Sequence, residues 1–338
     1  MKFNNVSVLG VAHVEAPIRV TSAALADRLL PTLERLGIRP DLLEMVSGIV
    51  ARRFWPEDVQ PSDAASMAAT KVIELTGLAP ERLGALVSTS VCKDYIEPSV
   101  ACLVHGNLGL SPDCINFDLG NACLAFLDGM DVVGNMIERG QIDYGIVVDG
   151  EGSRLPIERT IERLLDEGAD DVQFREEFAT LTLGSGAVAM ILCRSDLEPE
   201  AHAFSGAVRL AATEHNRLCI GQPDKMITDT RRLLAAGLEL AKRTWDKAVH
   251  ELEWTLDRFD VLAIHQVSRV HTEQLVQTIG LQLDQVVRIY PEYGNIGPAS
   301  VPMALSLAVQ EGRVKKGDRI GLLGIGSGLN CAMAELVW

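Results

Sequence analysis

Residues 120–126 read Gly-Asn-Ala-Cys-Leu-Ala-Phe. They join an apolar segment typical of a strand, 115–119, to a run typical of a helix that ends near Gly140. Cys123 therefore falls at an expected helix N-terminus, where backbone N–H groups favour the thiolate and small neighbours let a ligand approach. An isolated cysteine is more often a buried structural residue. A nucleophilic role for Cys123 therefore depends on partners elsewhere in the chain.

Two later segments supply candidate partners. An apolar run, 259–264, ends at His265, and residues 293–302 read Tyr-Gly-Asn-Ile-Gly-Pro-Ala-Ser-Val-Pro, which places Asn295 in a turn between glycines. Each feature alone is ordinary, because histidine at a strand end is often structural and Gly-Asn is common in turns. A cysteine, a histidine and an asparagine that all follow predicted strands together predict a nucleophile with a second polar site.

The sequence also repeats itself. Residues 82–90 are similar to residues 258–266, and the pattern of Gly-Asn, helix and strand over 120–148 recurs over 294–323. Short runs of Val, Ile and Leu separated by helical patterns predict two β-α-β halves with helices on both faces of the strands. In such sheets ligands bind at the carboxyl ends of the strands.

We expect an N-terminal half over 1–195 that carries Cys123 and a C-terminal half over 196–338 that carries His265 and Asn295. A charged stretch, 151–178, interrupts the first half and has apolar residues on one helical face. It predicts an inserted helical cap, which is either a solvated surface excursion or a wall over an acyl channel.

Composition limits the other possibilities. The 338 residues have a net charge of −15, which argues against a general nucleic-acid binder. Seven cysteines form no Cys-x-x-Cys pair and are odd in number, which is typical of reduced thiols in the cytoplasm. No N-terminal signal and no uninterrupted apolar run of about 18 residues is present. We therefore expect a cytoplasmic protein with no integral membrane segment.

The set of Cys123, His265 and Asn295, together with Thr-Leu-Gly-Ser-Gly-Ala-Val-Ala at 182–189 and Gly-Ile-Gly-Ser-Gly-Leu-Asn at 324–330, resembles the condensing enzymes of the thiolase superfamily. The similarity covers essentially the whole chain and is closest to the ketoacyl synthase III and hydroxymethylglutaryl-CoA synthase branches. It implies an α/β, thiolase-like duplicated αβαβα layered fold and a homodimer.

The resemblance also implies roles for the residues. Cys123 would carry an acyl group, while the backbone N–H groups of Cys123 and Ser327 would form the oxyanion site. His265 and Asn295 would polarise the carbonyl of the second substrate and stabilise its enolate. The resemblance implies no metal and no cofactor, with CoA thioesters as substrates.

A condensation without decarboxylation needs a base for the α-proton. Thiolases use a second cysteine near the C-terminus, but residues 324–328 contain none, and we expect Cys331 to be buried on a strand. Glu97 lies between Ile96 and Pro98 in the loop at 92–99, where partly apolar surroundings favour a raised pKa.

This loop is similar to that of the OleA-type subfamily, which joins two long-chain fatty acyl-CoA molecules head to head. The similarity implies that Glu97 reaches the partner's site as the base. The product would be a β-keto acid or β-ketoacyl-CoA, at the first step of long-chain olefin or ketone synthesis.

Two other functions stay open. A ketoacyl synthase III-like enzyme would decarboxylate a malonyl thioester and would not need Glu97. A non-catalytic subunit of the same fold would usually lack the nucleophile, which this chain retains.

The choice of acyl donor is a separate question. Val267-Ser268 replaces the Ala-Asn typical of ketoacyl synthase III, which puts docking of an acyl-carrier arm in doubt. The acidic net charge favours free CoA thioesters over acidic carrier proteins. Candidates for the CoA phosphates are Arg52, Arg53, Arg217, Lys225, Arg231 and Arg232.

Overall fold

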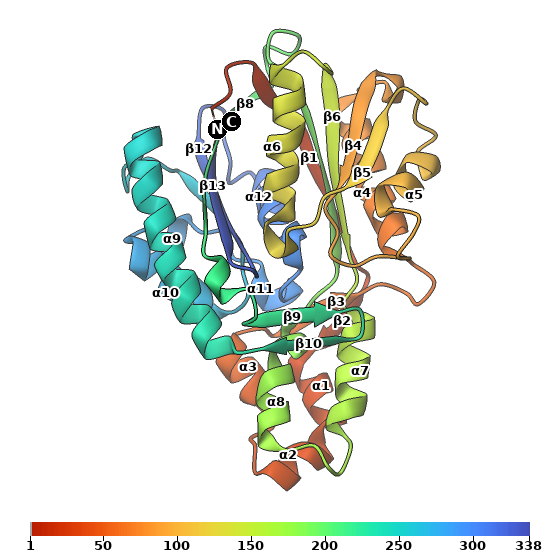
Figure 1. Ribbon diagram of the computed structural model, residues 1–338, viewed down its shortest axis with the longest axis vertical. Coiled ribbons are helices and arrows are strands. Elements are labelled where there is room, and N and C mark those ends of the chain that lie inside the picture. Colours follow the sequence, from red (N-terminus) through yellow and green to blue (C-terminus); the bar gives the residue numbers. More distant parts are fainter. Residues whose placement is uncertain (1) are drawn as a thin grey trace.

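The computed structural model describes residues 2–338 and is built on a nine-stranded sheet with the order β11-β12-β13-β8-β1-β7-β6-β4-β5 (Figure 1). The strands of this sheet are β1 Val6–Glu15, β4 Leu83–Ser88, β5 Ile115–Asp118, β6 Tyr144–Glu151, β7 Gly186–Arg194, β8 His202–Ala211, β11 Val261–Ile264, β12 Arg319–Gly326 and β13 Asn330–Val337. Two hairpins complete the strands: β2 Ile18–Thr21 with β3 Ala51–Phe54, and β9 Cys219–Gln222 with β10 Lys225–Thr228.

The α-helices are α1 Ser22–Arg28, α2 Leu30–Leu36, α3 Leu42–Ser47, α4 Pro61–Thr76, α5 Val100–Asn107, α6 Ala125–Glu138, α7 Arg154–Leu164, α8 Asp171–Glu177, α9 Thr230–Leu252, α10 Arg269–Ile279, α11 Tyr290–Tyr293 and α12 Ser300–Gln310. The 3-10 turns are η1 Pro80–Arg82, η2 Ala122–Leu124, η3 Phe178–Thr182, η4 Thr213–His215, η5 Leu283–Gln285 and η6 Gly297–Ala299.

The strand order contains the predicted duplication. The first half contributes β1-β7-β6-β4-β5, and the second half contributes the equivalent series β8-β13-β12-β11. A parallel bridge between Leu262 and Val286 stands where a fifth strand of the second half would lie. The two halves meet where β1 and β8 pair through Ser7 and Ala203.

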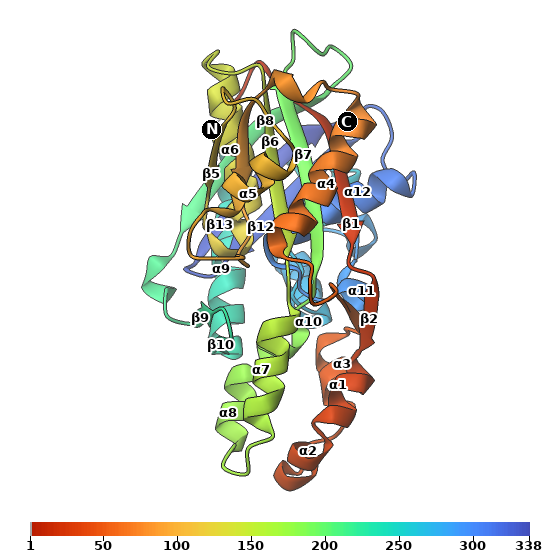
Figure 2. The same ribbon diagram turned by 90° about the vertical axis from the view of Figure 1, so that its right-hand side faces the viewer.

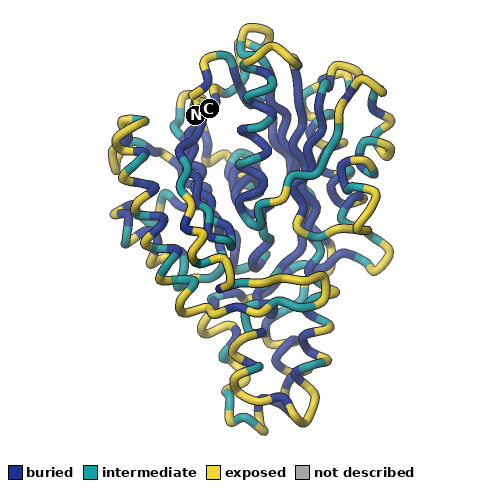
Figure 3. The backbone as a smooth tube through the Cα atoms, viewed as in Figure 1, coloured by how far each residue is buried: buried dark blue, intermediate teal, exposed yellow. Residues whose placement is uncertain are grey.

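Three apolar clusters arrange these strands in layers. Helices α6 and α12 lie between the two halves of the sheet and contact strands from both. Helices α4 and α5 cover the outer face of the first half, and α9 and α10 cover that of the second. Because both faces of the central strands are covered, every residue of β6 is buried (Figure 3). The predicted αβαβα layering is confirmed.

A helical lobe extends beyond the carboxyl ends of β4, β6 and β11 (Figure 1). The predicted cap at 151–178 supplies α7 and α8, but the segment at 22–47, which we had not predicted as part of a cap, supplies α1, α2 and α3. Figure 2 shows α7 and α8 beside α1 and α2. The two segments share an apolar cluster, and Thr32 Oγ1 donates to the Leu164 carbonyl at 2.6 Å.

Two elements begin later than the neighbouring sequence would allow. Strand β7 begins only at Gly186, because Thr182 and Leu183 pair instead with the segment around Asn295. Helix α9 begins at Thr230, because the residues before it form β10.

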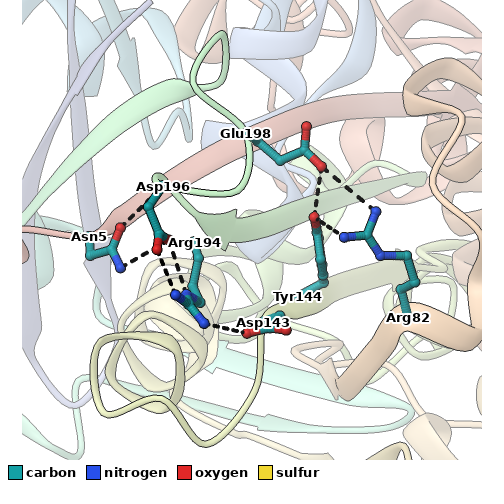
Figure 4. Close-up of polar contacts among 7 residues, drawn as sticks. All are labelled: Asn5, Arg82, Asp143, Tyr144, Arg194, Asp196 and Glu198. Atoms are coloured by element: carbon teal, nitrogen blue, oxygen red, sulfur yellow. Dashed lines mark hydrogen bonds and ion pairs between the residues drawn. The ribbon is translucent and has the colours of Figure 1, made fainter.

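A polar network fixes the opposite end of the sheet, where β6 begins and β7 ends (Figure 4). The Arg194 guanidinium bonds to Asp143 at 3.0 Å and to Asp196 at 2.6 Å. The Tyr144 hydroxyl donates to Glu198 at 2.7 Å and accepts a hydrogen bond from Arg82. This network is distant along the strands from Cys123, so it holds strand ends rather than a site.

Candidate active site

Cys123 lies in the turn η2 between β5 and α6. The preceding residue, Ala122, has a positive φ of 47°, a conformation that residues with a Cβ rarely adopt. Such strained turns cluster at functional sites. The Asn121 amide secures the turn, because its Nδ2 donates to Asp128 at 2.6 Å and its Oδ1 accepts from Asn330 at 3.1 Å. The cysteine is thus presented at the helix N-terminus, as the sequence indicated.

The resting thiol is not activated in the way we expected. Burial, and after it the nearby groups Cys219, Glu151 and Asp149, raise the pKa of Cys123 to about 12. A hydrogen bond from its own backbone acts in the opposite direction but is the smallest effect. Burial and carboxylates therefore outweigh the helix N-terminus, and Cys123 rests as a thiol.

His265 follows β11, and its backbone N–H donates to the Leu323 carbonyl of β12 at 2.8 Å. Burial lowers the pKa of His265 to about 3; His271 acts in the same direction, and a hydrogen bond with the Gly297 backbone opposes both. The imidazole is therefore neutral at pH 7. It borders a pocket lined also by Leu323, Gly324 and Ile325.

Gln266 fixes the segment that leads to Asn295, a role that we did not predict from the sequence. Its Nε2 donates to the Val287 carbonyl at 2.6 Å, and its Oε1 accepts from Ile289 N at 2.8 Å. Ser268, in place of the family's asparagine, caps α10 by accepting from His271 N at 3.2 Å. The departure from the ketoacyl synthase III pattern thus has a structural use in this chain.

Asn295 follows the short helix α11 and not a strand, so this part of the prediction was wrong. Its side chain and backbone are nevertheless held on three sides. Its N–H donates to the Thr182 carbonyl at 2.9 Å, its carbonyl accepts from Gly184 N at 2.8 Å, and its Oδ1 accepts from Gly297 N at 3.0 Å. The last bond occupies the amide oxygen and leaves Nδ2 as the donor available to a substrate. The turn η6, which follows Asn295, packs against η2 and so brings the amide to the Cys123 side of the sheet.

The C-terminal glycine-rich loop packs on the same turn. A Cβ added at Gly326 would lie 2.8 Å from the Asn121 carbonyl and 3.0 Å from Leu124 N. Only glycine allows this approach, and Ser327 follows directly. The structure therefore brings together the segments of Cys123, His265, Asn295 and Ser327. Cys331 is buried on β13, as predicted.

Glu97 is not part of this group within one chain. It lies in the loop between β4 and α5 and is exposed, next to Ile96, which is 99% exposed, and Tyr95. An isoleucine fully open to water is costly, so this loop is suited to contact another chain.

Two buried carboxyl groups at the end of β6 belong to the site and were missed from the sequence. Burial raises the pKa of Asp149 well above its usual range, and the neighbouring Glu151 adds to this. Burial likewise raises the pKa of Glu151 to about 7, against the hydrogen bonds that it accepts from Cys92 and Val91. Both carboxyls follow an apolar strand, so the same rule that singled out His265 also applied to them.

One CoA-phosphate candidate is corrected by the structure. Arg52 is fully buried and donates to the Leu181 carbonyl at 2.9 Å and to Ser22 Oγ at 3.1 Å, so it is closed to a solvent-borne phosphate. Arg53 is only partly exposed, 3.9 Å from Glu15. The remaining candidates gather around the β9–β10 hairpin and the start of α9: Arg217, Lys225, Arg231 and Arg232.

Residues 2–338 contain no group of three His, Cys, Asp or Glu side chains that could hold a metal ion. Over the same range, no helix has the length and apolar character needed to cross a membrane.

Comparison with known proteins agrees with this geometry. Residues 249–338 match the family model of the 3-oxoacyl-[acyl-carrier-protein] synthase III C-terminal domain. The chain is 52% identical to an acyl-CoA:acyl-CoA alkyltransferase of Xanthomonas campestris pv. campestris and 37% identical to one of Shewanella oneidensis, with all of each chain covered.

Solved structures agree as well. A cysteine-to-serine variant of Xanthomonas campestris OleA with bound lauric acid and lauroyl-CoA superposes with a TM-score of 0.98 at 51% identity, covering 99% of this chain and 100% of that one. The same protein bound to cerulenin also gives a TM-score of 0.98, at 52% identity and with 100% and 98% of the chains covered. Its glutamate-to-alanine and histidine-to-alanine variants are equally similar.

The layered fold, with a cysteine at a helix N-terminus facing a His–Asn pair, defines a condensing enzyme of the thiolase superfamily. Within that class, the full-length identity to two relatives decides the branch. The chain belongs to the OleA-type acyl-CoA:acyl-CoA alkyltransferase family.

Proposed function

We propose that this protein joins two long-chain fatty acyl-CoA molecules by a non-decarboxylative Claisen condensation. The observation that carries the proposal is the 52% identity, over the full length of both chains, to an acyl-CoA:acyl-CoA alkyltransferase. In addition, the glutamate, cysteine and histidine that were substituted in the Xanthomonas campestris structures have the same spacing along the chain as Glu97, Cys123 and His265.

In the first half-reaction, Cys123 Sγ attacks the thioester carbon of one acyl-CoA. The S–H proton passes to the departing CoA sulfur, so an acyl-enzyme and free CoA form without a net proton change. The N–H groups of Cys123 and Ser327 stabilise the oxyanion. Because the resting thiol is protonated, proton transfer must accompany attack, and the neutral His265 is suited to relay the proton.

In the second half-reaction, Glu97 of the partner subunit takes the α-proton of the second acyl-CoA. The enolate, held by His265 and Asn295 Nδ2, attacks the acyl-enzyme carbonyl. A carbon–carbon bond forms, the carbon–sulfur bond to Cys123 breaks, and the enzyme sulfur leaves as a thiolate. The proton that Glu97 took then passes to this sulfur, which restores the Cys123 thiol and the Glu97 carboxylate. The product is a β-ketoacyl-CoA, and hydrolysis of its thioester would give the β-keto acid.

The helical lobe contains an apolar pocket whose lining is suited to an alkyl chain. This pocket, between α1, α2, α3 and α8, is lined almost entirely by apolar side chains, including Leu29, Leu33 and Phe174. This composition supports the second reading of the 151–178 segment, a wall over an acyl channel. The cations near β9–β10, of which Arg217, Arg231 and Arg232 are exposed and Lys225 is partly exposed, are our candidates for the CoA phosphates. We place the protein in the cytoplasm.

The test supplies purified protein with a single saturated long-chain acyl-CoA and no malonyl thioester. Free CoA and extracted products are followed by mass spectrometry. We expect a product of doubled chain length from the native enzyme and none from Cys123→Ala. Acylation of Cys123 without a carbon–carbon bond until a malonyl thioester is added would instead support the decarboxylative alternative.

The homodimer and the role of Glu97 need a separate test. Sedimentation should give the mass of two chains, and Glu97→Gln should keep the release of one CoA per site while losing the condensation product. A mixed dimer of Cys123→Ala and Glu97→Gln chains should recover activity only if Glu97 serves the partner's site, because one complete site then forms between the chains.

A further inference from the structure

Glu151 binds the root of the loop that carries Glu97. It ends β6, is 5% exposed, and forms no ion pair with any residue of 2–338. Its Oε1 accepts from Val91 N at 2.6 Å, and the backbone of Cys92 also hydrogen-bonds to the carboxyl group. Next to it, the Cys92 thiol donates to the Gly152 carbonyl at 3.2 Å. Val91 and Cys92, near the start of the loop, are thus fixed to the end of β6.

The other side of the same carboxyl group faces the active site of its own chain. A Cβ added at Gly297 would lie 3.6 Å from Glu151 Cδ and 3.8 Å from its Oε2. Gly297 donates to Asn295 Oδ1, and its turn packs against the Cys123 turn. Glu151 is therefore in contact with both the His–Asn site and the loop.

The rest of the loop has other attachments. Asp94 accepts from Ser62 N at 3.0 Å, and Asp118 accepts from Val100 and Ala101 N at the start of α5. Between these points, residues 95–98 are exposed. Lys93 Nζ also donates to Asp118, at 2.9 Å. Glu151 is thus the attachment nearest to the site, and its loss would leave the root of the loop held there only by the bond between Cys92 and Gly152.

We propose that Glu151 is a positioning residue that holds the Glu97 loop in the conformation needed by the partner's site. The inference rests on the proposed function, in which Glu97 acts across the dimer. It predicts that Glu151 matters more for condensation than for acylation, because only condensation uses Glu97.

The charge of Glu151 should affect this attachment. An ionised carboxylate accepts N–H bonds more strongly than a protonated one. The titratable groups that face the carboxyl group are Asp149 from β6, Cys92 from the loop and Cys123 from η2. The other neighbours bring no titratable group: η6 contributes Gly297, and the Trp55 ring donates only to the backbone carbonyl of Glu151. Because the pKa of Glu151 is about 7, its carboxyl group ionises as the pH rises through neutrality. The loop should therefore be attached more firmly above pH 7 than below it.

The first experiment measures two rates with one saturated long-chain acyl-CoA: the burst of CoA release and the formation of doubled-chain product. For Glu151→Ala we expect a burst within about threefold of the native rate and condensation at least about 10-fold slower. Glu151→Gln keeps an acceptor oxygen, so it should condense faster than Glu151→Ala and lose the rise through pH 7. Glu335→Gln, at another buried glutamate far from the site, is the control for removing a buried charge.

Mixed dimers decide whether Glu151 acts through the loop. In the first, a Cys123→Ala chain is paired with a Glu151→Ala chain. The only nucleophile then lies in the Glu151→Ala chain, while its Glu97 comes from the intact loop of the Cys123→Ala chain, so condensation should return. In the second, one chain carries both substitutions and its partner is native. The native Cys123 then receives Glu97 from the loop of the substituted chain, which lacks the Glu151 attachment, so condensation should stay low. Equal activity of the two dimers, or equal loss of both half-reactions in Glu151→Ala, would overturn the inference.

Failure of the proposed function is recognised separately. In that case the native enzyme itself gives no doubled-chain product from acyl-CoA alone.

Discussion

Gly184→Ala should separate the two half-reactions, because Gly184 holds Asn295 and not Cys123. A Cβ at Gly184 would lie 1.8 Å from the Tyr293 carbonyl oxygen and 3.0 Å from its carbon. An ordinary contact needs about 3.4 Å, so the two backbones must separate by about 1.5 Å. Neither can yield by rotating a side chain. The Gly184 N–H bond to the Asn295 carbonyl, 2.8 Å long, must stretch or break.

The expected size follows from this displacement. A misplacement of about 1 Å at a catalytic group can reduce the rate by about 100-fold. Overpacking of a buried site also costs about 1–3 kcal/mol of the free energy of unfolding. We therefore expect condensation to fall by about 100-fold or more, a moderate loss of stability, and a burst of CoA release close to that of the native enzyme.

The assay is a single-turnover burst of CoA release, followed by mass spectrometry of the doubled-chain product. Gly106→Ala is the matched control, since a Cβ there meets nothing within 4 Å. Asn295→Ala removes only the amide and should give the same kinetic pattern even if Gly184→Ala folds poorly. Native condensation by folded Gly184→Ala, or equal loss of the burst and the product in Asn295→Ala, would refute the reasoning.

Three further results are expected. Alkylation of Cys123 by iodoacetamide, followed by peptide mass spectrometry, should accelerate about tenfold per pH unit from pH 7 to 10, because its thiol pKa is about 12; a plateau near pH 7 would contradict this. Leu33→Trp in the lobe pocket should shift the preferred substrate toward shorter acyl chains in competition assays, and an unchanged preference would remove the lobe from the acyl channel. Glu151→Gln should raise the free energy of unfolding at pH 8 by about 3 kcal/mol and change it little at pH 4.5. In the native protein, folding raises the pKa of the Glu151 carboxyl group from 4.5 to about 7, so the free energy of unfolding falls as the pH rises across that interval. Denaturant titrations in which the two proteins differ by the same amount at both pH values would exclude this cost of ionising Glu151.

The sequence predicted what depends on local pattern. The repeat of Gly-Asn, helix and strand predicted the duplication that the strand order contains. Cys123 and His265 do follow strands, as predicted, whereas Asn295 follows the helix α11. The lobe was only half predicted, because α1–α3 are short and pack against α7 and α8 from a distant part of the chain. Such pairing leaves little trace in a single segment.

Other features depend on partners that no motif reports. Leu183 bridges to Asn295, which is distant in the sequence, and the close approach of Gly184 to Tyr293 appears only once the two segments are together. The raised pKa of Cys123 likewise comes from burial and from carboxyls on another strand. In the proposed mechanism, the position of Glu97 relative to a site depends on two chains, which the sequence of one chain does not report.

The resting site carries little charge, and this favours the order of the two half-reactions. Burial raises the pKa of Cys123 because a thiolate is poorly solvated there, but the acyl-enzyme thioester is neutral and bears no such cost. The environment that opposes the free thiolate therefore does not oppose the acylated cysteine. His265, with its lowered pKa, adds no positive charge that would favour return of the thiolate. In the proposed mechanism, a dry and nearly neutral site thus holds the first acyl group until the enolate of the second substrate supplies the charge.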